Sequence, residues 1–196
     1  MGPFLHVSGG FLSKITLFEM MNLQIHTTKI RLLSLAAAVC LGTATDTYDA
    51  EGQTIEQHDS SSVTMESFAE ALDSLRGTIQ QTPPMYSALK YQGRRLHEMA
   101  RAGIEVERVP RTVEIMRLDV VQWEPPMVTL AIHCGRGVYI RSLAHDLGQL
   151  LGCGAHLAQL RRLRTGPFHA DQAVSLERMR ESLQDGSWSS LFYPPD

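Results

Sequence analysis

Arg141 is the residue whose position points most directly to chemistry. It follows the apolar residues Val138–Ile140, comes shortly after a Gly-Arg-Gly turn, and opens a stretch with helical leucine spacing. An arginine at the junction of a strand and a helix can direct its planar fork of N–H donors at a carboxylate or a phosphate. A surface arginine with a buried aliphatic stem would occupy the same place, so position alone leaves both interpretations open.

Asp46 and Asp49 are a second candidate, because paired carboxylates can carry out acid–base chemistry. Two residues separate them, and Thr45, Thr47 and Gly52 lie around them. Such composition is equally typical of a turn in which an aspartate side chain bonds to nearby backbone N–H groups. The spacing of the charges does not separate the two interpretations.

Histidine and cysteine residues raise the question of a zinc site. Neighbouring residues on a strand point to opposite faces, so His133 and Cys134 cannot share an ion. Cys153 with His156 supplies only two of the four ligands that structural zinc needs. No cysteine lies beside both a histidine and a helix start, the settings that lower a thiol pKa. We therefore expect neither a metal site nor a cysteine nucleophile, and the three dispersed cysteines argue against a disulfide framework.

Charge is distributed unevenly along a chain whose net charge is only -3. Residues 42–85 contain eight acids and one arginine, whereas residues 86–164 contain eleven arginines and one lysine against seven acids. Arginine matches phosphate oxygens and stacks on bases better than lysine does. The central stretch therefore favours a polyanion-binding face, although a solvated surface would have the same composition.

The elements that must position these residues alternate between helix and strand signals. Thr64 is a candidate cap for a helix that ends at Gly77, and the Pro125–Pro126 break joins two strands of a hairpin. A helix carrying spaced leucines follows Arg141. We expect helices over 64–76, 94–102, 141–151 and 156–163, and strands over 113–123 and 127–134. Local hairpins with helices between them predict an α+β fold with a mixed, mainly antiparallel sheet.

An apolar run extends from Leu32 to Leu41, preceded by the basic stretch Lys29–Arg31. The run is about half the length that a membrane-spanning helix needs, so we expect no membrane association. It resembles the apolar core of an exported leader, but its internal position and the Val39 before Cys40 count against export. A cytoplasmic location is the expectation.

Four segments read together resemble one family, the TruB tRNA pseudouridine synthases. They occur in the family's order and spacing, and they are GTATDTYDAEG (42–52), QTPPMYSALKYQGRRLHEMARAGIEV (81–106), GRGVYIRSLAHDLGQLLGCGAH (135–156) and LRRLRTGPF (160–168). The resemblance implies a pseudouridine synthase-like fold and isomerisation of a uridine in the T-arm loop of tRNA. It implies that the target base is flipped out of the loop and that the partner is tRNA. It also implies that the protein acts as a monomer and needs no cofactor and no metal.

The resemblance also assigns roles to residues of this chain. Arg141 would pair with the catalytic carboxylate, and Leu160 would pack against the flipped base. An RNA-gripping insertion would span 84–111. The residues expected to contact RNA are Tyr86, Lys90, Arg94, Arg95, Arg101, Arg161 and Arg162, a basic and aromatic mixture suited to phosphate contact and stacking.

Two departures from the family's pattern concern catalysis. The family's nucleophilic aspartate lies in a Gly-x-Leu-Asp-Pro motif, which residues 1–40 do not contain, and no aspartate precedes Asp46. The active-site tyrosine expected near residues 31–38 is also missing. We expect an atypical segment over 1–35, a partial, incomplete catalytic domain over 36–196 and no C-terminal RNA-binding domain. We therefore expect this chain to be a truncated tRNA pseudouridine synthase that is catalytically inactive. The alternatives are a non-catalytic tRNA-binding module or an exported protein.

Overall fold

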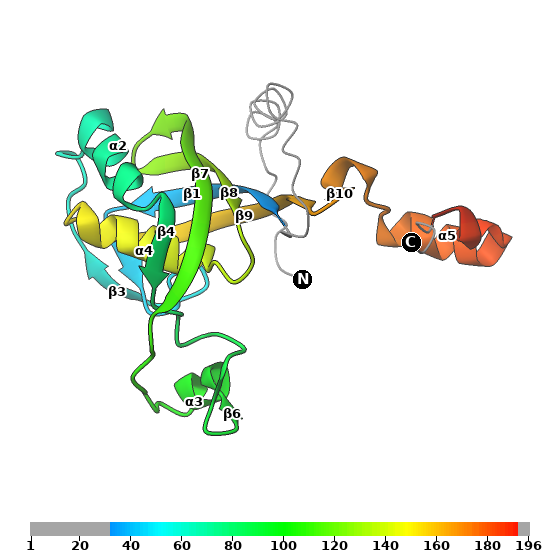
Figure 1. Ribbon diagram of the computed structural model, residues 1–196, viewed down its shortest axis with the longest axis horizontal. Helices are drawn as coiled ribbons and strands as arrows, with labels where there is room; N and C mark the ends of the chain where they lie inside the picture. Colours follow the sequence, from blue (N-terminus) through cyan, green and yellow to red (C-terminus); the bar gives the residue numbers. More distant parts are fainter. Residues whose placement is uncertain (1–31, 192–196) are drawn as a thin grey trace.

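The computed structural model describes residues 32–191 of the chain. A six-stranded antiparallel sheet in the order β10-β9-β1-β8-β7-β4 forms its centre (Figure 1). Its strands are β1 (Leu33–Leu41), β4 (Gly77–Gln81), β7 (Arg111–Glu124), β8 (Met127–Cys134), β9 (Ala155–Thr165) and β10 (Phe168–His169). Two short pairs lie outside this sheet, namely β2 (Thr43–Thr45) with β3 (Thr54–Gln57), and β5 (Lys90–Tyr91) with β6 (Arg94–Arg95).

The apolar run that resembles a leader forms β1, a strand inside the sheet. β8 pairs with one edge of β1 and β9 with the other. Leu35 and Ala37 point into the main core, and Ala36 and Ala38 on the opposite face are also buried. A strand buried on both faces needs a continuous apolar sequence rather than an alternating one. The basic stretch Lys29–Arg31 lies outside the described residues.

Two helices, α2 (Met65–Ser74) and α4 (Ile140–Leu150), cover one face of the sheet (Figure 1). The expected cap of α2 is confirmed, since the Thr64 hydroxyl accepts a hydrogen bond from the Ser67 N–H at 3.2 Å. Phe68 of α2 and Leu147 of α4 are fully buried in the same cluster as the inward side chains of β1 and β8. The apolar stripe of each helix therefore faces the sheet, as its leucine spacing predicts.

Sequence patterns predict the elements in this chain unequally well. The hairpin of β7 and β8 is confirmed, with Val128, Leu130, Ile132 and Cys134 buried on the core side. The helix expected over 94–102 is shorter, because Arg94–Arg95 form β6 and α3 spans Leu96–Arg101. The helix expected over 156–163 is wrong. Those residues belong to β9, which pairs along its length with β1.

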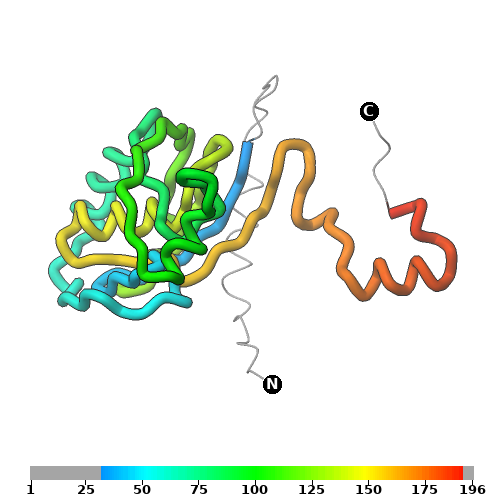
Figure 2. Tube along the Cα trace, turned by 90° about the horizontal axis from the view of Figure 1, so that it is seen from below, coloured from blue at the N-terminus to red at the C-terminus, as the bar shows by residue number. Residues whose placement is uncertain are grey.

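Two parts of the chain project from the sheet and its helices (Figures 1 and 2). One is the segment between β4 and β7, residues 82–110, which contains β5, β6 and α3 and is called the insertion below. The other follows β9 and carries β10, η1 (Ala170–Gln172), α5 (Leu176–Asp185) and η2 (Ser187–Leu191). α5 packs chiefly against η2. None of the helices in residues 32–191 is long and apolar enough to cross a membrane.

Candidate active site

The start of α4 is fixed by the end of β4, which places Arg141. The side chain of Gln81, which is almost fully buried, accepts a hydrogen bond from the Tyr139 N–H at 2.8 Å and donates one to the Tyr139 carbonyl at 3.1 Å. The Ser142 hydroxyl donates to the Thr82 carbonyl at 2.8 Å. Tyr139, the cap residue, makes no side-chain capping bond of its own, so Gln81, the last residue of β4, and Thr82, which follows it, supply the polar partners at this helix end.

Asp49 is positioned by a turn over residues 45–53. Its Oδ1 accepts hydrogen bonds from the Thr47 hydroxyl at 2.6 Å and from the Glu51 N–H at 3.1 Å. Its backbone carbonyl accepts one from the Thr45 hydroxyl at 2.7 Å. Asp46 closes the other end of the turn by accepting from the Gln53 N–H at 2.8 Å. The turn interpretation of the two aspartates is confirmed, and it leaves Oδ2 of Asp49 available.

Arg141 uses that oxygen. Its Nη1 donates to Asp49 Oδ2 at 2.9 Å, while its Nη2 donates to the Tyr86 carbonyl at 2.8 Å. The two charged side chains are 27% and 21% exposed, so water screens the pair less than it would at an open surface. One guanidinium therefore joins three parts of the chain, namely α4, the turn and the first residues of the insertion.

A second contact between α4 and the turn lies beside the ion pair. The Tyr48 ring stacks on His145 with centroids 3.9 Å apart and planes 12° apart. His145 is four residues after Arg141, so both side chains leave the same face of the helix. Burial lowers the pKa of His145, with Glu56 acting in the opposite direction. Tyr48 has a positive φ of 66°, a backbone conformation that costs free energy in a residue with a side chain. The stacking of its ring on His145 offsets part of that cost.

β9 completes the frame around the turn. The Leu157 N–H donates to the Tyr48 carbonyl at 2.9 Å, and its carbonyl accepts from the Ala50 N–H at 3.0 Å. Leu160 lies three residues further along the same strand and is 49% exposed. Arg161 and Arg162, which follow it, are also exposed. Leu160, Arg161 and Arg162 thus follow closely after Leu157, whose backbone holds the turn that contains Asp49. Their roles in binding stay predictions.

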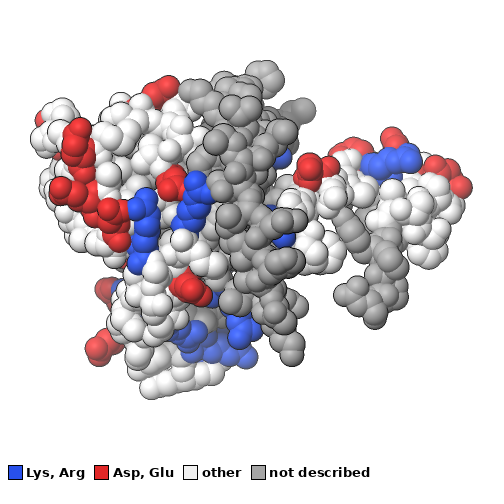
Figure 3. Space-filling model, turned by 45° about the horizontal axis from the view of Figure 1, so that its top comes forward, with Lys and Arg blue, Asp and Glu red and all other residues white. Residues whose placement is uncertain are grey.

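The expected RNA contacts of the insertion lie on its surface. Lys90, Arg94, Arg95 and Arg101 are exposed, and Tyr86 is half-buried next to Arg141. Backbone pairing of β5 with β6 brings Lys90 opposite Arg95. Lys and Arg side chains gather at the lower end of the molecule in Figure 3, where the insertion projects. The arrangement therefore concentrates positive charge on one protruding unit.

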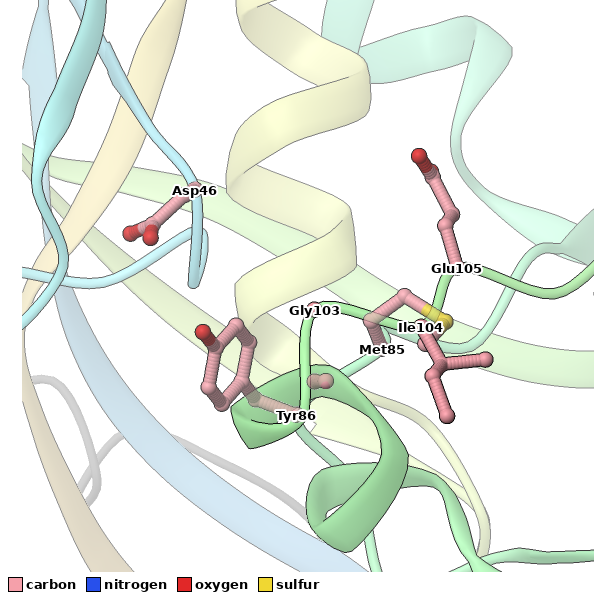
Figure 4. Close-up of a pocket in the computed structure, with 7 residues that line it drawn as sticks. Asp46, Met85, Tyr86, Gly103, Ile104 and Glu105 are labelled. Atoms are coloured by element: carbon pink, nitrogen blue, oxygen red, sulfur yellow. The ribbon is translucent and has the colours of Figure 1, made fainter.

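A cleft of about 250 Å³ separates the turn from the insertion (Figure 4). The Tyr86 hydroxyl points toward Asp46 across the cleft, whereas the Glu105 carboxylate points away from it (Figure 4). The lining residues are Asp46, Met85, Tyr86, Ala100, Gly103, Ile104 and Glu105. Carboxylates accept hydrogen bonds and a phenol ring offers a stacking surface, so the cleft has groups that suit a nucleobase edge and face.

The histidines and cysteines of the described residues are each held in separate surroundings or in pairs, such as Cys40 opposite His156 on neighbouring strands. Cys134 points into the core, where burial raises the pKa of its thiol to about 11, while His133 lies on the opposite face of the sheet. His156 is hydrogen-bonded through Nδ1 to the Thr43 carbonyl at 2.8 Å. In residues 32–191 no three His, Cys, Asp or Glu side chains gather closely enough to hold a metal ion.

Three features of the site are not recognisable from single residue types. The pairing of Arg141 with Asp49 joins residues 92 positions apart. The stacking of Tyr48 on His145 and the fastening of α4 by Gln81 are also long-range contacts. The parts of this arrangement that the sequence marks are the dense turn signals around Asp49 and the local pattern that places Arg141 at the start of a helix.

Solved structures share the fold. The chain matches the structure described as a Cbf5-Nop10-Gar1 complex with a TM-score of 0.60 and 24% identity, over 84% of this chain and 42% of that chain. An archaeal box H/ACA sRNP Nop10-Cbf5 complex matches with a TM-score of 0.53 and 20% identity, over 83% of this chain and 39% of that chain. At such identities the likeness concerns the fold alone, and it agrees with the expected pseudouridine synthase-like fold.

Sequence comparisons define the family. The model described as the N-terminal domain of TruB family pseudouridylate synthase matches residues 33–140. The model described as the tRNA pseudouridylate synthase B C-terminal domain matches residues 141–190. The chain belongs to the TruB family of pseudouridylate synthases. The division expected between residues 35 and 36 stays a prediction.

Curated relatives carry the name tRNA pseudouridine synthase B. The one from Geobacter sulfurreducens is 45% identical over 159 residues, which are 81% of this chain and 52% of the relative. The one from Pseudomonas aeruginosa is 48% identical over 151 residues, which are 77% of this chain and 49% of the relative. The chain spans about half the length of these relatives.

Proposed function

We propose that this chain binds tRNA, as its relatives' names suggest, that it does so at the T-arm, as the family resemblance implies, and that alone it does not isomerise the target uridine. The observation that carries the proposal is the guanidinium of Arg141, which links Asp49 to the Tyr86 backbone of a basic insertion. RNA that contacts the insertion would therefore lie close to the ion pair. The binding half of the proposal rests on Lys90, Arg94, Arg95 and Arg101, and on Arg161 and Arg162 of β9.

The catalytic half concerns a carboxylate nucleophile. In an isomerase of this kind the carboxylate attacks the base or its sugar, and Arg141 would keep that carboxylate ionised and oriented. Asp49 is poorly suited to attack, since one oxygen binds Arg141 and the other binds Thr47 and Glu51. No aspartate precedes Asp46 in the sequence. We propose that Asp49 orients Arg141 and that catalysis needs a carboxylate this chain does not supply.

The remaining expectations belong to the same proposal. The chain acts in the cytoplasm as a monomer, without cofactor or metal, and a bound base packs against Leu160. An RNA-binding module without chemistry is the function that this chain performs alone. Its affinity comes mainly from phosphate contacts, which position the RNA, rather than from base contacts, which specify it.

The test is tRNA binding measured across a series of salt concentrations. Binding to an unmodified tRNA transcript should weaken steeply with salt, because lysines and arginines displace counterions from phosphates. Arg94→Ala combined with Arg95→Ala should weaken binding to all RNAs alike. The matched control is Arg178→Ala with Arg180→Ala on α5, which removes two charges outside the insertion. Equal losses in both double variants would contradict an RNA-binding role for the insertion.

The same transcript tests the catalytic half. After incubation with the chain, mass spectrometry of the T-loop fragment should detect no pseudouridine. Detection of pseudouridine would overturn the proposal that this chain alone does not isomerise the uridine. Asp49→Asn would then test Asp49, since product formed by that variant would exclude Asp49 as the attacking group.

A further inference from the structure

A methionine, a cysteine and a histidine form a row across the neighbouring strands β8, β1 and β9. Cys40 of β1 lies opposite Met127 of β8 on one side and opposite His156 of β9 on the other. Directly opposite residues of antiparallel strands have Cβ atoms about 4.5–5.5 Å apart. Two donor atoms that each lie about 2.0–2.3 Å from one ion are at most about 4.5 Å apart. The three side chains are therefore spaced for binding a single ion above Cys40.

All three side chains point to the face of the sheet that is turned away from α2 and α4. Successive residues of a strand point to opposite faces, and the neighbours of the row in sequence belong to the core beneath these helices. These neighbours are Val39, Leu41, Val128, Ala155 and Leu157. The sheet therefore separates the row from α4, which carries Arg141. Cys40 and His156 are half-buried and Met127 is 38% exposed, so the row is accessible from solvent.

The hydrogen bond of His156 determines which of its ring nitrogens is available to an ion. Its Nδ1 lies 2.8 Å from the Thr43 carbonyl oxygen. A carbonyl oxygen only accepts hydrogen bonds, so in the neutral ring Nδ1 carries the proton and Nε2 keeps a lone pair. Metal-binding histidines have this arrangement, in which one ring nitrogen donates to a carbonyl and the other binds the ion. The contact with Thr43 is thus a second observation, independent of the strand register, that points to a ligand.

Cys40 differs from the other two cysteines in its surroundings. Cys134 and Cys153 are buried, whereas Cys40 is partly exposed. Its thiol has only a long contact with the Leu41 carbonyl, at 3.8 Å. An ion that binds the sulfur displaces the thiol proton, which passes to solvent as the bond between sulfur and metal forms. The change gives up little, because a thiol is a weak donor.

We propose that Met127, Cys40 and His156 form a binding site for copper(I). Thioether and thiolate sulfur are soft ligands that select copper(I), and imidazole also suits copper. Structural zinc needs four ligands, and in residues 32–191 no carboxylate gathers with Cys40 and His156. The ion would join three strands on the face away from Arg141. It therefore takes no part in the proposed function, and the inference does not rest on that function.

Competition for copper(I) tests the site in the full chain. Under anaerobic conditions with ascorbate, the protein should withdraw one equivalent of copper(I) from the coloured bicinchoninate complex. Cys40→Ser should abolish the withdrawal. Met127→Leu, which removes the sulfur at an exposed position, should raise the Kd at least about 10-fold, the lower end of the loss seen when even an outer partner of a metal ligand is removed. Met65→Leu is the matched control, because Met65 of α2 is also 38% exposed, and it should leave the Kd unchanged.

X-ray absorption at the copper edge identifies the donor atoms. The parent protein should show two sulfur neighbours and one nitrogen neighbour, and Met127→Leu should show one sulfur fewer. His156→Asn is a further variant, because the asparagine amide can still donate to the Thr43 carbonyl but has no counterpart of Nε2. Its spectrum should lack the imidazole nitrogen.

The outcomes decide between the copper(I) site and its rivals. Failure to withdraw copper(I), or withdrawal that survives Cys40→Ser, overturns the site. If Cys40→Ser does not fold, Met127→Leu decides, and an unchanged Kd or an unchanged number of sulfur neighbours in that variant overturns the assignment. Displacement of the bound copper(I) by equimolar zinc overturns the choice of a soft ion.

Discussion

Arg141 connects the turn, α4 and the insertion through two hydrogen bonds from a single side chain. Replacing it with methionine would leave the Asp49 carboxylate partly buried without its counter-charge and the Tyr86 carbonyl without its donor. We expect Arg141→Met to reduce the free energy of unfolding by about 1–3 kcal/mol, measured by urea denaturation. A double-mutant cycle with Asp49→Asn isolates the pair. A neutral Arg141→Met would show that the pair contributes no stability.

Asp146 provides a pH-dependent prediction at the same scale. Burial raises the pKa of the Asp146 carboxyl to about 6, whereas the unfolded chain titrates this group near pH 4. The folded state therefore binds more protons between about pH 4 and pH 6, and stability falls as pH rises through that range. Discounting for partial exposure, Asp146→Asn should raise Tm by about 2–4 °C at pH 8 and change it little at pH 4.

Calorimetry of both proteins at the two pH values provides the measurement. Comparison of the variant with the parent at each pH removes the contribution of the other carboxyl groups. A variant less stable than the parent at pH 8 would mean that the ionised Asp146 has a favourable partner.

The sequence predicts where Arg141 lies but not what it binds. The pattern around Arg141 is local, with a Gly-rich turn before it and a helix after it. Its partner Asp49 is 92 residues away, and nothing in the spacing of the charges connects the two. The turn around Asp49 and the position of Arg141 are both predictable, because each is determined by residues that are adjacent in the sequence.

At the scale of elements, close packing between α4 and β9 depends on a glycine. A methyl group at Gly148 would overlap the backbone of Gly154 and Ala155. We expect Gly148→Ala to destabilise the fold by about 3 kcal/mol, because the backbone would have to separate to admit the methyl group. Thermal and urea unfolding measure the loss. Gln149→Ala, at the next and exposed position of α4, is the matched control and should change stability little.

The elements that the sequence predicts wrongly are those with distant partners. Leu157, Leu160 and Leu163 recur every third residue, which favours a helix, but pairing with β1 makes this segment the strand β9. β1 itself has no alternation, because both of its faces are buried. The β7–β8 hairpin was predictable, since residues 113–123 have the composition of a strand, residues 127–134 alternate, and the break between them contains two prolines. Local signals determined α2 and α4 in the same way.

At the scale of the molecule, one layer of helices on an antiparallel sheet supports two projecting parts with different surfaces. The insertion is basic and is tied to Arg141 through Tyr86. The part that contains α5 exposes apolar side chains, including Leu176 and Leu183. The order of strand and helix signals predicted the α+β class, and the uneven distribution of charge favoured a polyanion-binding face in the middle of the chain. Neither signal predicted that this part of the chain protrudes from the sheet, because that depends on the ends of β4 and β7 lying side by side.

The position of β1 between β8 and β9 also has a consequence for synthesis of the protein. Leu35 pairs with Ile132 on one side and Arg162 on the other, so neither neighbour exists until much later in translation. At about 5–20 residues per second, this apolar strand would wait roughly 6–25 s after leaving the ribosome before β9 follows. During that interval it has both edges free to pair with other chains. We therefore expect the nascent chain to depend on chaperones while β1 waits for its partners. The strands β7 and β8 need less protection, because they can pair with each other as soon as both are synthesised.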